Sequence, residues 1–272
     1  MAKNKRYPYT RGDIDAAYRQ LKQDSYFDSV DLFLRDRIAT FESSTDFEKR
    51  LDSVVAVLND LLHGASPDSI GLLNEWINKI NFHCLPKSFK SLENESNQTG
   101  PLLKNDRVNN IIHFISNDRS LQEYAVDKAN YYIDAPIELH IIDIIWSTTV
   151  GPILDKDLIE YCLGNRLDLD ESGIYNSRSS RLFKLYYKQY ATWRDKAIEY
   201  SLRELSENKR DIIIIGLDIK QFYYNTEVDW VGIRNRFKSE LYNNTFFIKL
   251  TEVINNMRPL QNAVWHLNYS SK

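Results

Sequence analysis

Four consecutive isoleucines, at positions 212–215, constrain the fold of this chain more than any other feature. β-Branched side chains favour an extended backbone and pack well on a pleated surface. An unbroken apolar run is typical of a central strand that is covered on both faces. We therefore expect a buried strand over residues 211–217, and Asp218 follows at the point where the strand leaves its cover.

Asp218 has two interpretations in this place. The carboxylate can cap the turn or helix that follows. It can also bind a hard dication, because Mg²⁺ prefers carboxylate and carbonyl oxygens, and the Ile219 carbonyl would be a second ligand. Phosphoryl transfer by two metal ions needs such a platform. Its position alone leaves both interpretations open.

The first part of the chain is predicted to be helical. Apolar side chains recur three and four positions apart over residues 13–80, and a Gly-Ala-Ser-Pro-Asp turn interrupts them at residues 64–68. Residues 86–106 are rich in Ser, Asn, Lys and Gly, so we expect an exposed loop there.

A strand and a buried helix are expected next. Residues 130–136 look extended, because the residue before a proline avoids the helical region. The apolar stretch after Pro136 predicts a buried helix that ends at Gly151, with His140 and Asp143 as structural residues. A turn follows at Gly164.

Basic and aromatic residues are concentrated in a later helix, which Ser179 or Ser180 can cap. The helical period favours a place in the core for Tyr186, Tyr190 and Trp193. The positive charges of this segment either face solvent or contact phosphate, and Tyr187 or Tyr190 would then stack on bases. They belong to Arg178, Arg181, Lys184, Lys188, Arg194 and Lys196.

Composition excludes several classes of protein. The formal net charge is −3, which counts weakly against a dedicated nucleic-acid binder. Neither Cys84 nor Cys162 belongs to a CxxC pair, so we expect no disulfide framework and no cysteine zinc site. The N-terminus lacks the apolar stretch of a signal peptide, and no apolar run is long enough to cross a bilayer. We expect a cytoplasmic protein without a membrane partner.

The residues around Asp218 resemble the first palm motif of reverse transcriptases. In that family an aspartate closes a strand, and two aromatic residues follow four and five positions later, here Phe222 and Tyr223. The resemblance extends over residues 124–230. Ala135-Pro136 and the helix after it look like the fingers segment. Gly164-Asn165-Arg166-Leu167 looks like the GNRL turn of bacterial antiviral, defence-associated reverse transcriptases, which the chain resembles best.

This resemblance implies roles for individual residues. Asp218 would be the first catalytic aspartate and, with the Ile219 carbonyl, a ligand of Mg²⁺. Phe222 and Tyr223 would bind the nucleotide, and Tyr223 would lie under the sugar and exclude a 2′-hydroxyl. The implied nucleic-acid contacts are Arg166, Arg178, Arg181, Lys184 and Lys188.

The chain departs from the family pattern in two ways. Tyr131 occupies the position where the fingers usually place an arginine or lysine against the triphosphate, and Lys128 is the nearby substitute. No Tyr-x-Asp-Asp motif occurs, and nothing after Trp230 holds paired aspartates. We therefore expect a fragment or a natural truncation without a thumb, which does not polymerise by itself. The open side of the strand would make it self-associate, bind a partner or rearrange.

The sequence thus predicts an α+β fold with a helical N-terminal region (1–125), a fingers-like region (126–208) and a partial palm (209–272). The predicted function is the N-terminal part of an RNA-directed DNA polymerase in antiviral defence. Its partners would be Mg²⁺, deoxynucleoside triphosphates, an RNA template, the DNA product, and a second protein or the missing C-terminal part. The alternative is a catalytically inactive polymerase-like module that binds RNA or a protein.

Overall fold

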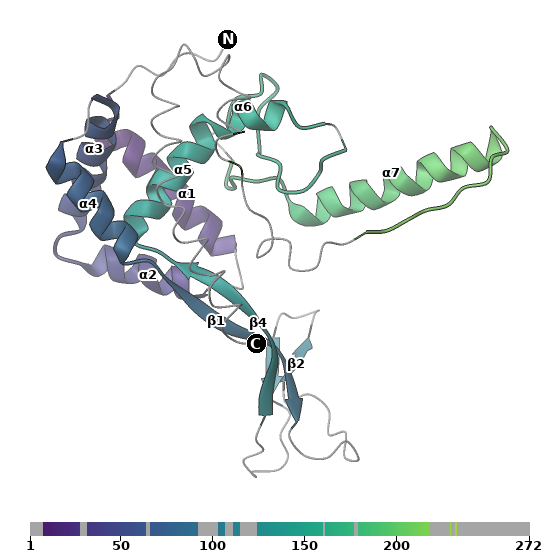
Figure 1. Cartoon of the computed structure of the whole chain (residues 1–272), viewed down its shortest axis with the longest axis horizontal. Helices are drawn as coiled ribbons and strands as arrows, with labels where there is room; N and C mark the ends of the chain where they lie inside the picture. Colours follow the sequence, from purple (N-terminus) through teal and green to yellow (C-terminus); the bar gives the residue numbers. More distant parts are fainter. Residues whose placement is uncertain are drawn as a thin grey trace. The chain divides into compact units, whose positions relative to one another are not determined.

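The computed structural model describes most of the chain up to residue 217 (Figure 1). The described residues are 8–27, 32–63, 66–91, 103–106, 111–114, 124–159, 161–176, 179–217, 229 and 232. The chain divides into two compact units, Met1–Asn81 with Asp134–Lys272 and Phe82–Ile133. The predicted boundaries after residues 125 and 208 do not coincide with this division and stay a prediction.

Four amphipathic helices open the chain, as the sequence predicts. They are α1 (Arg11–Phe27), α2 (Leu32–Ser43), α3 (Phe47–His63) and α4 (Pro67–Asn78). The predicted turn before α4 is stabilised by an N-cap, because the Ser69 N–H donates to Ser66 Oγ at 3.2 Å. Pro67 suits the first helical turn, where its missing N–H leaves no bond unmade.

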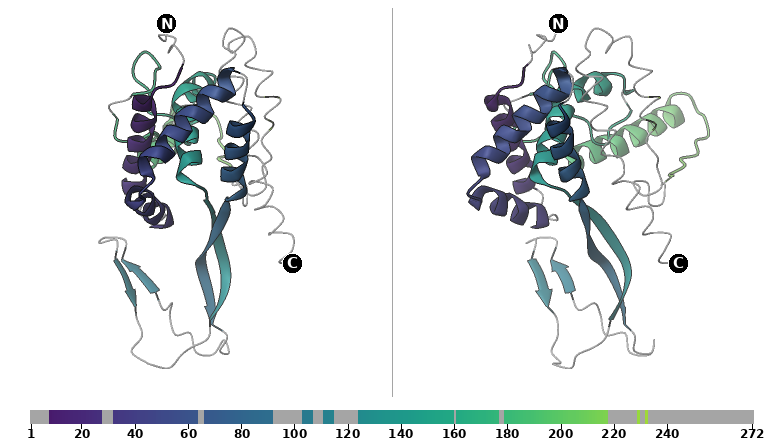
Figure 2. Two further views of the ribbon diagram at one scale, coloured as in Figure 1. Left: turned by 90° about the vertical axis from the view of Figure 1, so that its left-hand side faces the viewer. Right: turned by 60° about the vertical axis from the view of Figure 1, so that its left-hand side comes forward.

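Helix α5 (Ile137–Thr149) is the centre of the core, as expected from its apolar sequence. It contacts α1, α2, α3 and α4, and both views in Figure 2 show it lying among them. Ile141 and Ile142 are completely buried. The helix begins directly after Pro136, whose fixed φ permits the change from strand to helix.

Two small sheets make up the strand content of the described residues. Strand β1 (Asn81–Ser91) pairs with β4 (Tyr124–Asp134), and β2 (Leu103–Asp106) runs antiparallel to β3 (Ile111–Phe114). The expected loop over residues 86–106 is therefore wrong for β1 and β2, and the predicted helical region 1–125 contains strands. Polar composition misled the prediction, because a two-stranded sheet has little cover and needs no apolar run.

The segment that follows α6 (Gly151–Lys156) and precedes Tyr186 folds as an irregular loop. Leu167 and Phe183 form an antiparallel bridge, and the Lys184 N–H donates to the Arg166 carbonyl at 2.8 Å. These bonds hold residues 182–184 extended. Helix α7 (Tyr186–Ser206) therefore begins at Tyr186, and the predicted caps at Ser179 or Ser180 are wrong.

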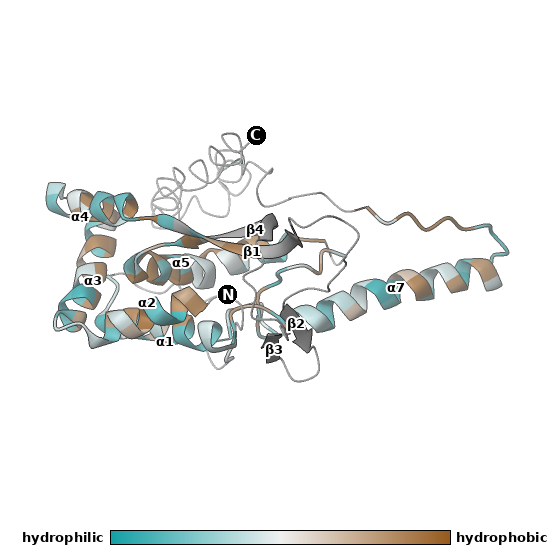
Figure 3. Ribbon diagram, turned by 90° about the horizontal axis from the view of Figure 1, so that it is seen from below, coloured by the Kyte–Doolittle hydropathy of each residue, from teal (hydrophilic) through white to brown (hydrophobic). Residues whose placement is uncertain are grey.

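Residues 211–217 do not form the predicted buried strand. They belong to neither sheet, and Ile213 and Leu217 are 85% and 90% exposed. Figure 3 shows this stretch as an apolar segment beyond the end of α7. A strand requires a neighbour for its backbone groups, and no described strand pairs with these residues.

The described residues are mostly helical with a small strand content, which agrees with the predicted α+β class in its coarse form. Most of the predicted palm, from Asp218 onward, lies outside them. Within the described ranges, none of the helices combines the length and the apolar character that a membrane crossing needs.

Two bidentate ion pairs attach the N-terminal helices to the junction between β4 and α5. Arg50 of α3 donates to the two carboxylate oxygens of Glu138 at 2.7 and 3.1 Å, and Glu138 is only 3% exposed. Arg37 of α2 binds both oxygens of the buried Asp134. Each acid is thus desolvated but fully paired, which is the condition under which a buried charge is tolerated.

Removing Arg50 from its ion pair with Glu138 should destabilise the fold. Arg50→Met leaves Glu138 buried without its arginine, so we expect the free energy of unfolding to fall by about 3 kcal/mol in chemical denaturation. Glu138→Leu added to Arg50→Met should restore much of that loss.

Lys79→Met is the matched control, because it breaks the exposed pair with Glu75 and should change stability by less than about 1 kcal/mol. If Arg50→Met lowered the free energy of unfolding no more than this control, the ion pair between Arg50 and Glu138 would not stabilise the start of α5.

Candidate nucleic-acid interface

Residues 172–194 form the most strongly basic segment of the chain. It contains no aspartate or glutamate but five arginine or lysine residues and six aromatic residues. We call residues 172–194 the basic segment. Positive charge without intervening carboxylates is typical of a surface that neutralises phosphate.

The basic segment is anchored to α1 before α7 begins. Asp24 accepts a hydrogen bond from the Leu182 N–H at 3.0 Å, and the Tyr175 hydroxyl donates to Gln20 Oε1 at 2.5 Å. Leu182 itself is buried. Burial raises the pKa of the Asp24 carboxyl, although its hydrogen bonds to Leu182 and Gln20 act in the opposite direction. Burial also raises the pKa of Tyr175 to about 12.

Three aromatic side chains form an exposed face on α7. Tyr186, Tyr190 and Trp193 are 73%, 49% and 54% exposed, and their spacing of four and three residues puts them on one side of the helix. The ring centroids of Tyr186 and Tyr190 are 6.2 Å apart in a stacked arrangement, and those of Tyr190 and Trp193 are 5.8 Å apart. We call these three residues the aromatic face. The predicted core position for them is wrong, because no residue of α7 is buried.

Cations lie next to the aromatic face in the sequence. Lys184 and Lys188 are exposed, and no ion pair is found for either among the described residues. Arg181 is partly buried, and Arg194 pairs with Asp195 at 2.8 Å. The two lysines are therefore open to solvent, and their contact with nucleic acid stays a prediction.

Arg166 is occupied by structural bonds. Its guanidinium donates to both oxygens of the Asp155 carboxylate at 2.9 and 2.8 Å, and to the Asp155 and Cys162 carbonyls at 3.0 Å each. The hydrogen bond to Asp155 raises the pKa of Arg166 further above its ordinary value. Arg166 thus caps the end of α6, because Asp155 lies in the last turn of that helix. The adjacent Asn165 has φ +50°, a conformation that asparagine tolerates in turns.

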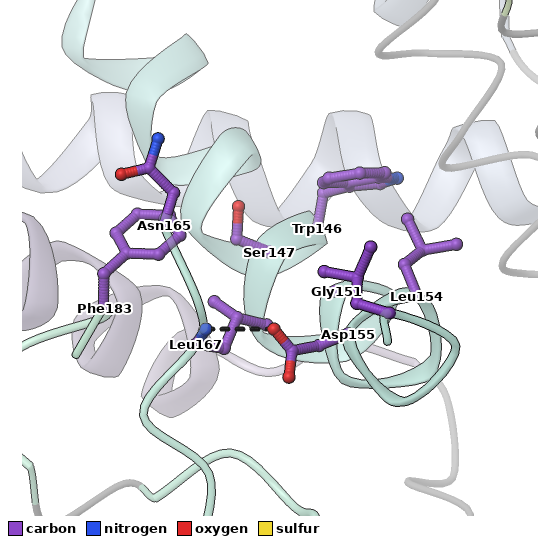
Figure 4. Close-up of a pocket in the computed structure, with 9 residues that line it drawn as sticks. Trp146, Ser147, Gly151, Leu154, Asp155, Asn165, Leu167 and Phe183 are labelled. Carbon is purple, nitrogen blue, oxygen red and sulfur yellow. Dashed lines mark hydrogen bonds between the residues drawn. The ribbon is translucent and has the colours of Figure 1, made fainter. Parts of the chain in front are cut away.

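A pocket of about 210 Å³ lies beside this turn (Figure 4). Its walls are mainly the apolar side chains of Trp146, Leu154 and Phe183, and the Asp155 carboxylate already accepts the Leu167 N–H. At Gly151 a Cβ would lie 2.8 Å from Leu167 Cδ1, so any larger residue there would have to displace the Leu167 side chain. The pocket therefore offers few free polar groups to a ligand.

Comparison with protein-family models, curated proteins and solved structures found no match. The functional assignment of this chain therefore rests on its own residues.

Several predicted site residues lie outside the described residues. These are Asp218, Ile219, Phe222, Tyr223 and Arg178. Lys128 lies in β4, and only its backbone is described. Across the described part of the chain, no group of three or more histidine, cysteine or acidic residues could hold a metal ion. The predicted Mg²⁺ site therefore stays a prediction.

Asp229 is the described acid closest to Asp218 along the downstream chain. Its carboxylate accepts the Gly232 N–H at 2.8 Å, three residues ahead, as an N-cap does. The Asp229 carboxylate is thus already engaged by the backbone that follows it.

The favoured interpretation of the sequence placed the aromatic face in the core, and stacking by Tyr190 was the alternative. The period of this face is the same in a buried helix and in an exposed one. The signal that separates the two cases is the lack of carboxylates in the basic segment, because a core helix normally carries acids on its solvated side.

The Asp24 anchor predicts a dependence of stability on pH. Because its pKa is raised above the ordinary 3.8, the folded chain keeps this proton to a higher pH than the unfolded chain. The stabilisation from Asp24 is thus complete below pH 3.8 and is lost as the pH rises through the raised pKa.

Asp24→Asn keeps an acceptor for the Leu182 N–H but cannot ionise. As the pH rises from 3.8 through the raised pKa of Asp24, the wild type should lose stability and the variant should not. The difference in the free energy of unfolding, measured by denaturation at a series of pH values, should therefore shift in favour of the variant. A difference that stays constant with pH would show that Asp24 is not the titrating group.

Proposed function

We propose that this chain is the N-terminal part of an RNA-directed DNA polymerase that acts in bacterial antiviral defence. The observation that carries the proposal is the order of features along the sequence. A proline-containing strand end, an apolar helix, a Gly-Asn-Arg turn and an aromatic helix precede Asp218 and its two aromatics. Each feature alone is only moderately specific, but their order is that of a reverse transcriptase.

The described geometry supports this proposal in its upstream part. Strand β4 ends at Asp134, and Pro136 leads directly into the buried α5, as in a fingers segment. Asn165 forms a tight turn, and Arg166 secures it against α6. These elements would give the fingers a rigid base.

Asp218 would carry the chemistry together with ligands from elsewhere. A carboxylate and the Ile219 carbonyl supply oxygen ligands, which suit Mg²⁺. Two dications beside a triphosphate need several carboxylates, and no adjacent aspartates occur in this sequence. A polymerase site would therefore be completed by acids that these 272 residues do not supply.

A second candidate is a polymerase-like binding module without catalysis. The exposed aromatic face of α7 favours it, since such a surface serves binding whether or not nucleotides are incorporated. The first candidate needs Asp218 for nucleotide incorporation, whereas the second incorporates no nucleotides and needs only its binding surface.

Replacing Asp218 tests the first candidate. In the complete protein, Asp218→Asn should abolish primer extension with Mg²⁺ and deoxynucleotides, because the amide is a poor ligand for the metal. The matched control is Asp229→Asn, which makes the same change of carboxylate to amide, keeps an acceptor for the Gly232 N–H and should leave extension measurable. Incorporation by Asp218→Asn at the wild-type rate would exclude the assignment.

Tyr223 tests the predicted selection of the sugar. Tyr223→Val removes the ring that would lie under the nucleotide sugar, so the variant should incorporate ribonucleotides more readily. Deoxynucleotide incorporation by the same variant is the internal control in the same kinetic assay. Unaltered discrimination in Tyr223→Val would mean that this side chain is not the steric gate.

A further inference from the structure

We propose that the aromatic face of α7 stacks on the bases of a single-stranded nucleic acid, with Lys184 and Lys188 against its phosphates. The inference deepens the proposed function and rests on it, because a polymerase must handle unpaired strands. It assigns a role to three side chains that the catalytic motif does not use.

The exposure of the rings is the first argument. Tyr186, Tyr190 and Trp193 are each about half exposed or more, although aromatic side chains of this size normally bury most of their surface. Their rings lie in series, with interplanar angles of 28° and 39° between neighbours. Aromatic faces in series match a strand whose successive bases each present a flat surface.

Charge is the second argument, and it favours a nucleic acid over a protein as the partner of the aromatic face. From residue 172 to Arg194 the chain carries no carboxylate, whereas Lys184 and Lys188 are exposed around the first turn of α7. A protein partner that covered aromatic rings would not require this excess of cations. A polyanion does, because cations in contact with phosphate release its counterions.

The two halves of α7 differ in a way that supports this assignment. The first half holds the aromatic face and the cations. The second half carries exposed aliphatic side chains at Ile198, Leu202 and Leu205, together with carboxylates at Glu199 and Glu204. Figure 3 shows the polar and apolar residues along the helix. The second half also has an exposed ring, Tyr200, with the Arg203 guanidinium 5.4 Å from its centroid, so the first half differs by having no carboxylate up to Arg194.

Affinity for a labelled single-stranded oligonucleotide, measured by fluorescence anisotropy with the full chain, tests the inference. Tyr190→Ala and Trp193→Ala should each weaken binding about 5- to 150-fold, the range expected for one stacked base. Tyr190→Phe should bind like the wild type, because stacking needs the ring and not the hydroxyl. A duplex of the same sequence should bind more weakly than the single strand, since its bases are already stacked.

Tyr26→Ala is the matched control, because Tyr26 is 74% exposed but lies outside the basic segment. It should leave the affinity unchanged. Lys184→Gln with Lys188→Gln should lower the slope of log affinity against log salt by about 1.4, which is 0.7 for each of two phosphate contacts on a single strand.

The outcomes separate the inference from the proposed function. If the wild type bound no single strand, or if the alanine variants bound like Tyr26→Ala, the stacking role would be overturned. Alanine variants that instead changed the oligomeric state would assign the face to a protein contact and overturn it as well. Stacking with full affinity in Asp218→Asn, but no nucleotide incorporation by the complete wild-type protein, would refute the polymerase and leave the inference standing.

Discussion

The requirement to bury α5 without leaving a charge unpaired governs the described part of this structure. Ile141 and Ile142 on this helix are fully buried, yet its first turn carries Glu138, which lies in the same interior. An isolated buried carboxylate would be strongly destabilising, so the arginine that meets it must come from a fixed position. Arg50 on α3 provides this partner, and Arg37 on α2 does the same for Asp134. The N-terminal helices, which carry no recognisable motif, thus have a physical role as the support of α5.

Helix α7 differs from α5 because most of its side chains are exposed. It has an aromatic face with helical periodicity, but none of its residues is buried. Its start is fixed through Leu182 and Asp24, while its own side chains stay available. A well-supported base that presents an exposed, basic and aromatic helix is the arrangement expected of a binding surface. The proposed polymerase function gives this surface a ligand, and the stacking inference gives it a mode of recognition.

Sequence patterns predicted the elements whose stability is local or whose cover is complete. The amphipathic period of α1 to α4, the Pro136 junction and the apolar α5 were all predictable, because each residue pattern has one physical solution.

Sequence patterns gave wrong predictions where the structure of a segment depends on which other segment packs against it. The aromatic face has the period of a core helix, and residues 212–215 have the composition of a central strand, yet the aromatic face and Ile213 to Ile215 are exposed. Strand β1 was missed for the related reason that a sheet with little cover does not need an apolar sequence. For the candidate site, the exposed lysines were predicted, whereas the bonds that occupy Arg166 required the position of Asp155.

Hydrogen–deuterium exchange of the backbone amides, with and without a single-stranded oligonucleotide, tests the contrast between a packed α5 and an available α7 most directly. The amides of α5 should exchange slowly in both states, because opening them requires loss of the core. Those of α7 should exchange quickly in the free chain and become protected when the oligonucleotide is added. Equal protection of α5 and α7 in the free chain would contradict the account, since it would mean that α7 is already covered.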